Sequence, residues 1–158
     1  MPLVTLDALP ALLAPQARLL GLDVGKKTVG LALSDVRRTV ASPMETIART
    51  KLAADIERIR AIVAKQAVGG LVAGLPVSMD GTEGPRCQSV RQFAADLAKA
   101  IDLPLAFYDE RLSTAAVERL LIDEADMSRK RRDEVIDKMA AAYILQGALD
   151  LLARQASF

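Results

Sequence analysis

One stretch, residues 19–35 (LLGLDVGKKTVGLALSD), constrains the fold more than any other part of the chain. Apolar residues alternate with others on both sides of Gly25, which predicts two strands. Gly25 and the two lysines after it predict a tight turn, because glycine adopts backbone conformations that other residues resist. The stretch is therefore predicted to be a β-hairpin that carries one carboxylate, Asp23, inside its first apolar strand.

Asp23 has two interpretations. A charge in an apolar strand is costly unless it is paired or binds a cation, which favours a ligand-binding role. A carboxylate at the end of a strand can also cap a turn by accepting hydrogen bonds from backbone N–H groups. The residues of this stretch alone favour neither interpretation over the other.

The rest of the chain predicts further strands and helices in a mixed order. Strands are expected over 39–50, 71–75 and 103–108, and helices over about 51–66, 85–101 and 133–153, with another helix capped by Ser113 or Thr114. Pro43 predicts an edge position or a bulge in its strand, and Gly69 and Gly70 are expected to end the first helix. The helical crossovers make the two late strands parallel to each other.

These elements predict an α/β fold with a mixed five-stranded sheet flanked by helices. No repeat or linker divides the chain, so its 158 residues are expected to form one domain. The domain is expected to span residues 19–153. An N-terminal extension of residues 1–18 precedes it, and a short tail of residues 154–158 follows.

Composition excludes several kinds of site. The chain has no histidine, which removes Ser-His-Asp triads, Cys-His dyads and imidazole zinc sites together. Its single cysteine excludes an internal disulfide and fits a cytoplasmic location. No apolar run approaches the roughly 20 residues needed to cross a bilayer, and no signal peptide is recognisable, so no membrane partner is expected. The net charge of +1 means that nucleic acid would need a local basic patch.

Carboxylates stand where strands are predicted to end. Asp109 and Glu110 close the last strand, and Asp137, with Glu134 one turn earlier, borders the apolar face of the final helix. If the first and last strands are parallel, these acids and Asp23 meet at one rim, where ligands of α/β sheets gather. Several acids at one rim favour a divalent-metal site. The alternative for any single acid is a partner for a nearby lysine or a charge at a helix start.

Four motifs occur in order along the chain: Gly21–Lys26 with Gly30 and Ser34-Asp35, Gly74–Pro76 with Met79–Gly84, Asp109–Thr114, and Asp137–Gln146. Together they resemble the YqgF/RuvX family from about residue 19 to residue 152. The resemblance implies an RNase H-like fold and a nuclease that matures the 5′ end of pre-16S rRNA in ribosome biogenesis. The family has also been linked to Holliday junction resolution by analogy with RuvC.

The same resemblance implies that Asp23, Glu110 and Asp137 are the acidic triad, both catalytic residues and metal ligands. RuvC-type enzymes carry their second acid on the strand matched here by residues 72–75, which has no carboxylate. Glu110 must take that role, which makes junction cleavage the less secure inference. An all-oxygen site suits Mg²⁺ or Mn²⁺, and two ions can cleave a phosphodiester without a histidine base. Asp23 is expected to bridge the two ions.

Cations beside the acids are candidate substrate ligands: Lys26, Arg111, and the run Arg129, Lys130, Arg131 and Arg132. The alternative for each is solvated surface. The expected partner is pre-16S rRNA, with DNA junctions as the other candidate, bound by a monomer or weak homodimer.

Two other classes of protein compete with a nuclease. An actin-like ATPase or sugar kinase also uses Asp-x-Gly hairpins, but such proteins need two domains around a nucleotide cleft, and the chain has neither that length nor a P-loop. A non-catalytic nucleic-acid-binding module would keep the fold without the chemistry, and only loss of activity on removing Asp23 separates it from an enzyme.

Overall fold

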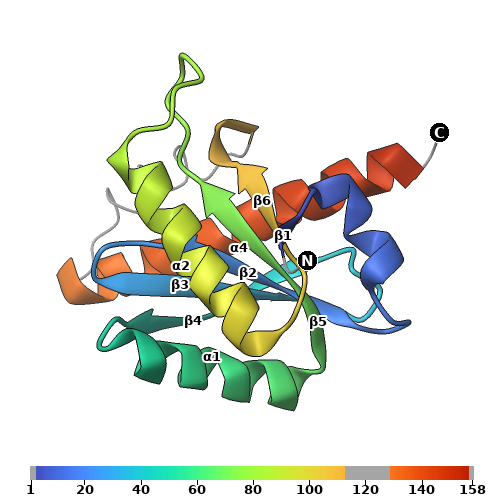
Figure 1. The fold of residues 1–158 in the computed structure, drawn as a ribbon, viewed down its shortest axis with the longest axis horizontal. Helices are drawn as coiled ribbons and strands as arrows, with labels where there is room; N and C mark the ends of the chain where they lie inside the picture. The colour runs from blue at the N-terminus through green and yellow to red at the C-terminus, as the bar shows by residue number, and fades with distance from the viewer. Residues whose placement is uncertain (1–2, 113–128, 157–158) are drawn as a thin grey trace.

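The computed structural model describes residues 3–112 and 129–156, which are built around one mixed sheet in the order β1-β6-β5-β2-β3-β4 (Figure 1). The strands are β1 (Leu3–Val4), β2 (Arg18–Val24), β3 (Thr28–Ser34), β4 (Ala41–Ala48), β5 (Val68–Leu75) and β6 (Leu105–Asp109). The α/β fold class is confirmed. The sheet has six strands rather than the predicted five, because β1 lies in the segment that was expected to be an extension.

The predicted hairpin is confirmed as β2 and β3, which pair antiparallel with Asp23 opposite Gly30. The Gly25 N–H donates to the carbonyl of Thr28 at 2.8 Å and closes the turn. Arg49 also holds the turn, because its Nη1 donates to the Gly25 carbonyl at 2.7 Å. This hairpin supplies the centre of the sheet.

Strand β4 lies at the sheet edge and also carries a bulge, so both predictions from Pro43 are confirmed. Its register against β3 changes between Leu31, which pairs with Glu45, and Ala32, which pairs with Pro43. Proline has no backbone N–H to donate, so it is accommodated where the ladder is interrupted or has no further neighbour.

Two helices, α1 (Leu52–Gln66) and α2 (Pro85–Ile101), cover one face of the sheet, and α4 (Arg129–Ala156) covers the other (Figure 1). Leucine, isoleucine and valine side chains of β2, β3 and β5 pack with α1 and α2 in one apolar cluster. A second cluster joins the opposite sheet face to the alanine-rich middle of α4. Small residues let α4 approach the sheet backbone closely, which proves important for the site.

Helix α1 ends at Gln66 as predicted, but glycine does not end it. The residue that follows, Ala67, has a φ of 54°, and Gly69 and Gly70 lie inside β5 rather than before it. A Cβ at Gly69 would lie 2.7 Å from the Cβ of Ala17, and one at Gly70 would lie 2.9 Å from Leu19 Cδ2. These glycines are there because side chains of the preceding segment and of β2 pack directly on the strand, and not to stop a helix.

The N-terminal segment packs on the domain. Beyond β1, which pairs parallel with β6, it forms two 3₁₀ helices, Leu6–Ala8 and Pro10–Leu12. Leu9 between them is completely buried in the same apolar cluster as α4. The division of the chain at residue 18 and the tail after residue 153 stay predictions.

The predicted cap at Ser113 or Thr114, and the helix after it, lie outside the described residues. The start of α4 at Arg129 corrects the predicted start at residue 133, so the basic run from Arg129 to Arg132 belongs to the first turn of this helix. In the described part of the chain, no helix is long and apolar enough to cross a membrane.

Candidate active site at the carboxyl ends of the parallel strands

The three parallel strands β2, β5 and β6 end at one rim of the sheet. Strand β5 pairs parallel with β6, which confirms that the two late strands are parallel, and it also pairs parallel with β2, so the first strand runs in the same direction. Asp23 is the penultimate residue of β2, and Glu110 begins the 3₁₀ turn Glu110–Leu112 that follows β6. The topology therefore brings these two acids to the same edge.

Asp23 is buried, with only 6% of its surface exposed. Its neighbours along β2 are apolar and buried as well. Taking a carboxylate out of water is costly unless charge or hydrogen bonds compensate it, so this strand position favours a residue that binds something.

Helix α4 brings Asp137 to the same place through a glycine contact. A Cβ added at Gly30 would overlap the backbone carbonyl of Asp137, so only glycine lets α4 pack against β3 here. Gly30 is the residue paired with Asp23. The Asp137 carboxylate is also held by Thr28, whose hydroxyl donates to Oδ2 at 2.6 Å. Asp137 is thus fixed over the hairpin at the position beside Asp23.

Glu110 reaches back over β5 through a second glycine. A Cβ added at Gly74 would lie 2.8 Å from Oε1 of Glu110. Gly74 follows Ala73, which pairs with Leu22, so Gly74 lies at the level of Asp23 on the neighbouring strand. The carboxylate of Glu110 therefore lies over the middle strand, between its own strand and that of Asp23.

The donor chemistry at this rim suits a hard divalent cation, since carboxylate oxygens are the ligands that Mg²⁺ and Mn²⁺ prefer. Within residues 3–112 and 129–156, no group of three or more His, Cys, Asp or Glu side chains is arranged closely enough to hold a metal ion. The backbone brings Asp23, Glu110 and Asp137 to one rim, and closing a coordination shell would need movement of their side chains.

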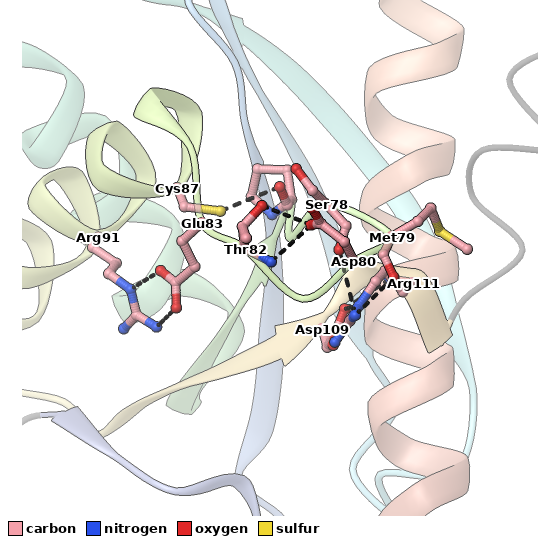
Figure 2. Close-up of polar contacts among 10 residues, drawn as sticks. Ser78, Met79, Asp80, Thr82, Glu83, Cys87, Arg91, Asp109 and Arg111 are labelled. Atoms are coloured by element: carbon pink, nitrogen blue, oxygen red, sulfur yellow. Dashed lines mark hydrogen bonds and ion pairs between the residues drawn. The ribbon is translucent and has the colours of Figure 1, made fainter.

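Asp109, a further candidate ligand, is engaged by Arg111 (Figure 2). The guanidinium Nη2 lies 2.6 Å from Oδ2, and Nε lies 3.1 Å from Oδ1. This hydrogen bonding lowers the pKa of the Asp109 carboxyl from its ordinary value. Glu134 is another candidate metal ligand, and its side chain is outside the part of the structure that is described.

Arg111 also holds the loop between β5 and α2. Its Nη1 donates to the carbonyls of Ser78 at 3.3 Å and Met79 at 3.5 Å (Figure 2). Arg111 was predicted to hold substrate phosphate; the structure places it between Asp109 and the loop. Sequence reasoning missed this double contact, because the loop carbonyls are more than thirty residues away.

The loop itself, residues 76–84, has its own hydrogen bonds. Asp80 accepts from the N–H and the hydroxyl of Thr82 at 3.0 and 2.7 Å. Glu83 forms a two-bonded ion pair with Arg91 of α2, at 2.7 and 2.8 Å (Figure 2). These bonds hold an exposed loop above the rim, with Met79 86% exposed at its tip.

The remaining predicted cations are placed at two sides of the rim. Lys26 is exposed in the hairpin turn, three residues after Asp23. The run from Arg129 to Arg132 lies in the first turn of α4, one to two turns before Asp137, and the direction of its side chains lies outside the description. Gly30, Gly74 and Thr28 were not singled out from the sequence as site residues; a glycine inside a strand is the signal that could have indicated close backbone approach.

Known proteins match most of the chain. A family model described as "RuvX: Holliday junction resolvase" matches residues 17–151. A protein of Paramagnetospirillum magneticum, named "Putative pre-16S rRNA nuclease", is 65% identical over 150 residues, covering 95% of this chain and 96% of that protein. A protein of Rhodospirillum rubrum with the same name is 55% identical over 155 residues, covering 98% of this chain and 96% of its own length.

Solved structures show the same fold at low sequence identity. T. thermophilus RuvC in complex with a Holliday junction substrate aligns with a TM-score of 0.55 at 13% identity, covering 89% of this chain and 97% of RuvC. The yeast mitochondrial Holliday junction resolvase Ydc2 aligns with a TM-score of 0.53 at 14% identity, covering 97% of this chain and 86% of Ydc2.

Proposed function

The chain belongs to the RuvX family, and from this premise we propose that it is a nuclease that hydrolyses phosphodiester bonds at the 5′ end of pre-16S rRNA. The family model spans most of the chain, and relatives between 53% and 65% identical carry the pre-16S rRNA nuclease name. The structural likeness to RuvC and Ydc2 supports the fold of a nucleic-acid-cleaving enzyme.

The observation that carries the proposal is the arrangement of three acids around two glycines. Gly30 lets α4 place Asp137 beside the partner residue of Asp23, and Gly74 leaves room for the carboxylate of Glu110. Cβ atoms at either position would displace these contacts. A surface that only binds RNA would need cations at this point rather than a concentration of carboxylates.

The three acids Asp23, Glu110 and Asp137 would hold Mg²⁺ or Mn²⁺. Bound divalent ions would supply activation of a water molecule and stabilisation of charge on the departing oxygen. The chain contributes orientation: Thr28 fixes the Asp137 carboxylate, and the 3₁₀ turn after β6 directs Glu110 over β5. With no histidine in the chain, proton removal from water does not rest on imidazole.

Substrate phosphates would be held by cations around the rim. Lys26 and the first turn of α4 are the leading candidates. Arg111 could bind a phosphate only if its ion pair with Asp109 were broken. We place the enzyme in the cytoplasm, where its RNA is made and where a single free cysteine is in keeping with reducing conditions.

A second candidate function is cleavage of Holliday junctions, favoured by the family description and by the fold shared with RuvC. One experiment ranks the two. Purified protein is incubated with a 5′-extended pre-16S RNA fragment and with a four-way DNA junction, each with Mg²⁺ and with chelator. We expect magnesium-dependent cutting of the RNA, lost in Asp23→Asn. Junction cutting alone would reverse the ranking, and no cutting by the unmodified protein would favour the binding module.

A further inference from the structure

A hollow of about 570 Å³ lies beside the rim, between the hairpin turn and the first turn of α2. Val24, Pro76, Pro85 and Val90 form its apolar lining. The volume falls in the range of about 300–1,000 Å³ that is typical of small-ligand sites, in which apolar walls surround a few polar groups. The hollow is therefore large enough for one nucleotide.

The polar lining of the hollow is cationic. Lys26 and Arg86 both border it, together with Ser78 and Ser89, and the described residues of its lining include no aspartate or glutamate. Neither cation makes a hydrogen bond or ion pair with any residue of the described ranges, and both are exposed. Arg91 and Arg111 nearby are each held by a carboxylate, Glu83 and Asp109. Lys26 and Arg86 are thus two cations of the hollow with charge available for an anion.

The hollow lies at the end of β2 that carries Asp23, on the side of the sheet covered by α2. Val24, Gly25 and Lys26 line it and follow Asp23 directly in the chain, within about 10 Å at the rise of an extended strand. A larger hollow of about 720 Å³ lies where β2 begins, at the opposite end of the strand from Asp23. Because it lies far from the acids, that hollow is the poorer candidate for substrate.

We propose that the hollow between the hairpin turn and α2 binds the nucleotide next to the cleaved phosphate. Lys26 and Arg86 contact the phosphate of that nucleotide, and the apolar lining receives its sugar or base. This inference rests on the proposed nuclease function and extends it, because it assigns a substrate-binding role to Arg86 and to the α2 side of the rim. The bound strand then crosses the acids from the first turn of α4 towards α2.

The test measures binding of a single-stranded, 5′-extended pre-16S RNA fragment to the full chain carrying Asp23→Asn, which prevents cleavage. In that background we compare two double variants. The hollow variant carries Lys26→Ala and Arg86→Ala, and the control variant carries Lys65→Ala and Lys99→Ala. The control removes two exposed cations from the last turns of α1 and α2, away from the rim. Both variants lose the same net charge, so a difference between them reports position.

We expect the hollow variant to weaken binding at least about tenfold, because contacts from cations to phosphate are among the stronger hydrogen bonds. Its log–log salt slope should fall by about 1.4, two single-strand contacts at about 0.7 each, and the control slope should not change. A series of RNAs, each with one neutral methylphosphonate, locates the contact. A methylphosphonate at one position near the cut should weaken RNA binding by the Asp23→Asn parent protein and should not weaken RNA binding by the hollow variant.

Two outcomes separate the inference from its premise. If the unmodified protein cleaves the RNA but the hollow and control variants bind it equally, the hollow has no role in substrate binding and the proposal is overturned. If the unmodified protein neither binds nor cleaves the RNA, the proposed function fails and the hollow proposal fails with it. Protein melting temperatures are recorded for both variants, and equal values exclude misfolding as the cause of weaker binding.

Discussion

The carboxylate of Glu110 lies over the α-carbon of Gly74, so closely that a Cβ at position 74 would stand 2.8 Å from Oε1. The same Cβ would lie 2.5 Å from Cδ1 of Ile144 in α4. The carboxylate of Glu110 therefore lies over β5, although Glu110 follows β6 in the chain. Glu110 and Ile144 of α4 both occupy the space that a side chain at position 74 would fill, so Gly74 is needed for the geometry of the site.

Gly74→Ala is expected to lower activity and stability together. The new methyl group must displace Glu110 and Ile144, and overpacking of this kind costs about 1–3 kcal/mol. The measurements are the RNA cleavage rate and the free energy of unfolding in denaturant. Ser42→Thr is the control, because it adds one methyl group to an exposed residue of the edge strand β4, and it should leave both quantities nearly unchanged. Equal behaviour of the two variants would contradict the close contact at Gly74.

Divalent metal is expected to raise the melting temperature of the protein. A ligand that binds only the folded state stabilises it by about 2.7 kcal/mol at a concentration one hundred times its Kd. Asp23→Asn, Glu110→Gln and Asp137→Asn should each reduce the shift produced by Mg²⁺ or Mn²⁺. Without metal these variants should melt at or above the unmodified protein, since fewer like charges share the rim.

The control for the metal shift is Asp7→Asn, which neutralises an exposed carboxylate in the first 3₁₀ helix. Its metal-induced shift should equal that of the unmodified protein. Undiminished shifts in all three rim variants would mean that the acids do not bind the metal, whatever the activity assay shows.

Much of the fold could be predicted because its signals are local. Alternation on both sides of Gly25 indicates the hairpin, and helical crossovers imply parallel strands, which together bring Asp23 and Glu110 to one edge. Strand β1 could not be predicted, because two residues have no periodicity and their only signal is pairing with β6. The start of α4 was missed for the same reason: a run of four cations has no apolar repeat.

The parts of the site that sequence reasoning missed are contacts between distant residues. Gly30 meets Asp137 across more than one hundred residues, and Thr28 reaches the same acid. A single sequence does not indicate which glycine in a strand will pack against a helix backbone, as Gly30 does, and which will pack against a side chain, as Gly74 does. Arg111 stands next to Glu110 in the chain, yet its charge is directed to Asp109 and the loop.

Thr28→Val is expected to reduce cleavage more than it reduces stability. Valine keeps the shape but removes the hydroxyl that donates to Asp137 Oδ2 at 2.6 Å, a loss of about 1 kcal/mol in stability. The Asp137 carboxylate would then lose one of the contacts that orient it, and the metal concentration needed for half-maximal activity should rise. Thr28→Ser keeps the donor and should restore that concentration. An unchanged metal requirement in Thr28→Val would show that the hydroxyl has no positioning role.

Acid should destabilise the turn between β3 and β4 through Asp35. Its carboxylate accepts from the N–H groups of Val40 and Thr39, which lowers the pKa from 3.8 to about 2. Because the folded pKa is the lower one, the stabilisation is complete above about pH 4 and is lost as pH falls towards 2. Melting temperatures of the unmodified protein and Asp35→Asn should therefore converge over that interval. Curves that stay parallel from pH 5 to pH 2 would contradict this.

Depletion of the protein in its host should cause 5′-extended small-subunit RNA to accumulate, and an Asp23→Asn copy should not restore normal ends.

A resolvase needs two active sites related by a dimer axis to make paired cuts. In the described part of the chain, the exposed large apolar side chains are spread over six segments: Leu3, Leu12, Val36 with Val40, Leu52, Met79 and Leu112. Stable dimers usually bury a continuous apolar patch, so we expect a monomer or weak homodimer in sedimentation at micromolar concentration. Normal RNA ends after depletion, with symmetric junction cutting by a stable dimer, would instead assign the protein to junction resolution.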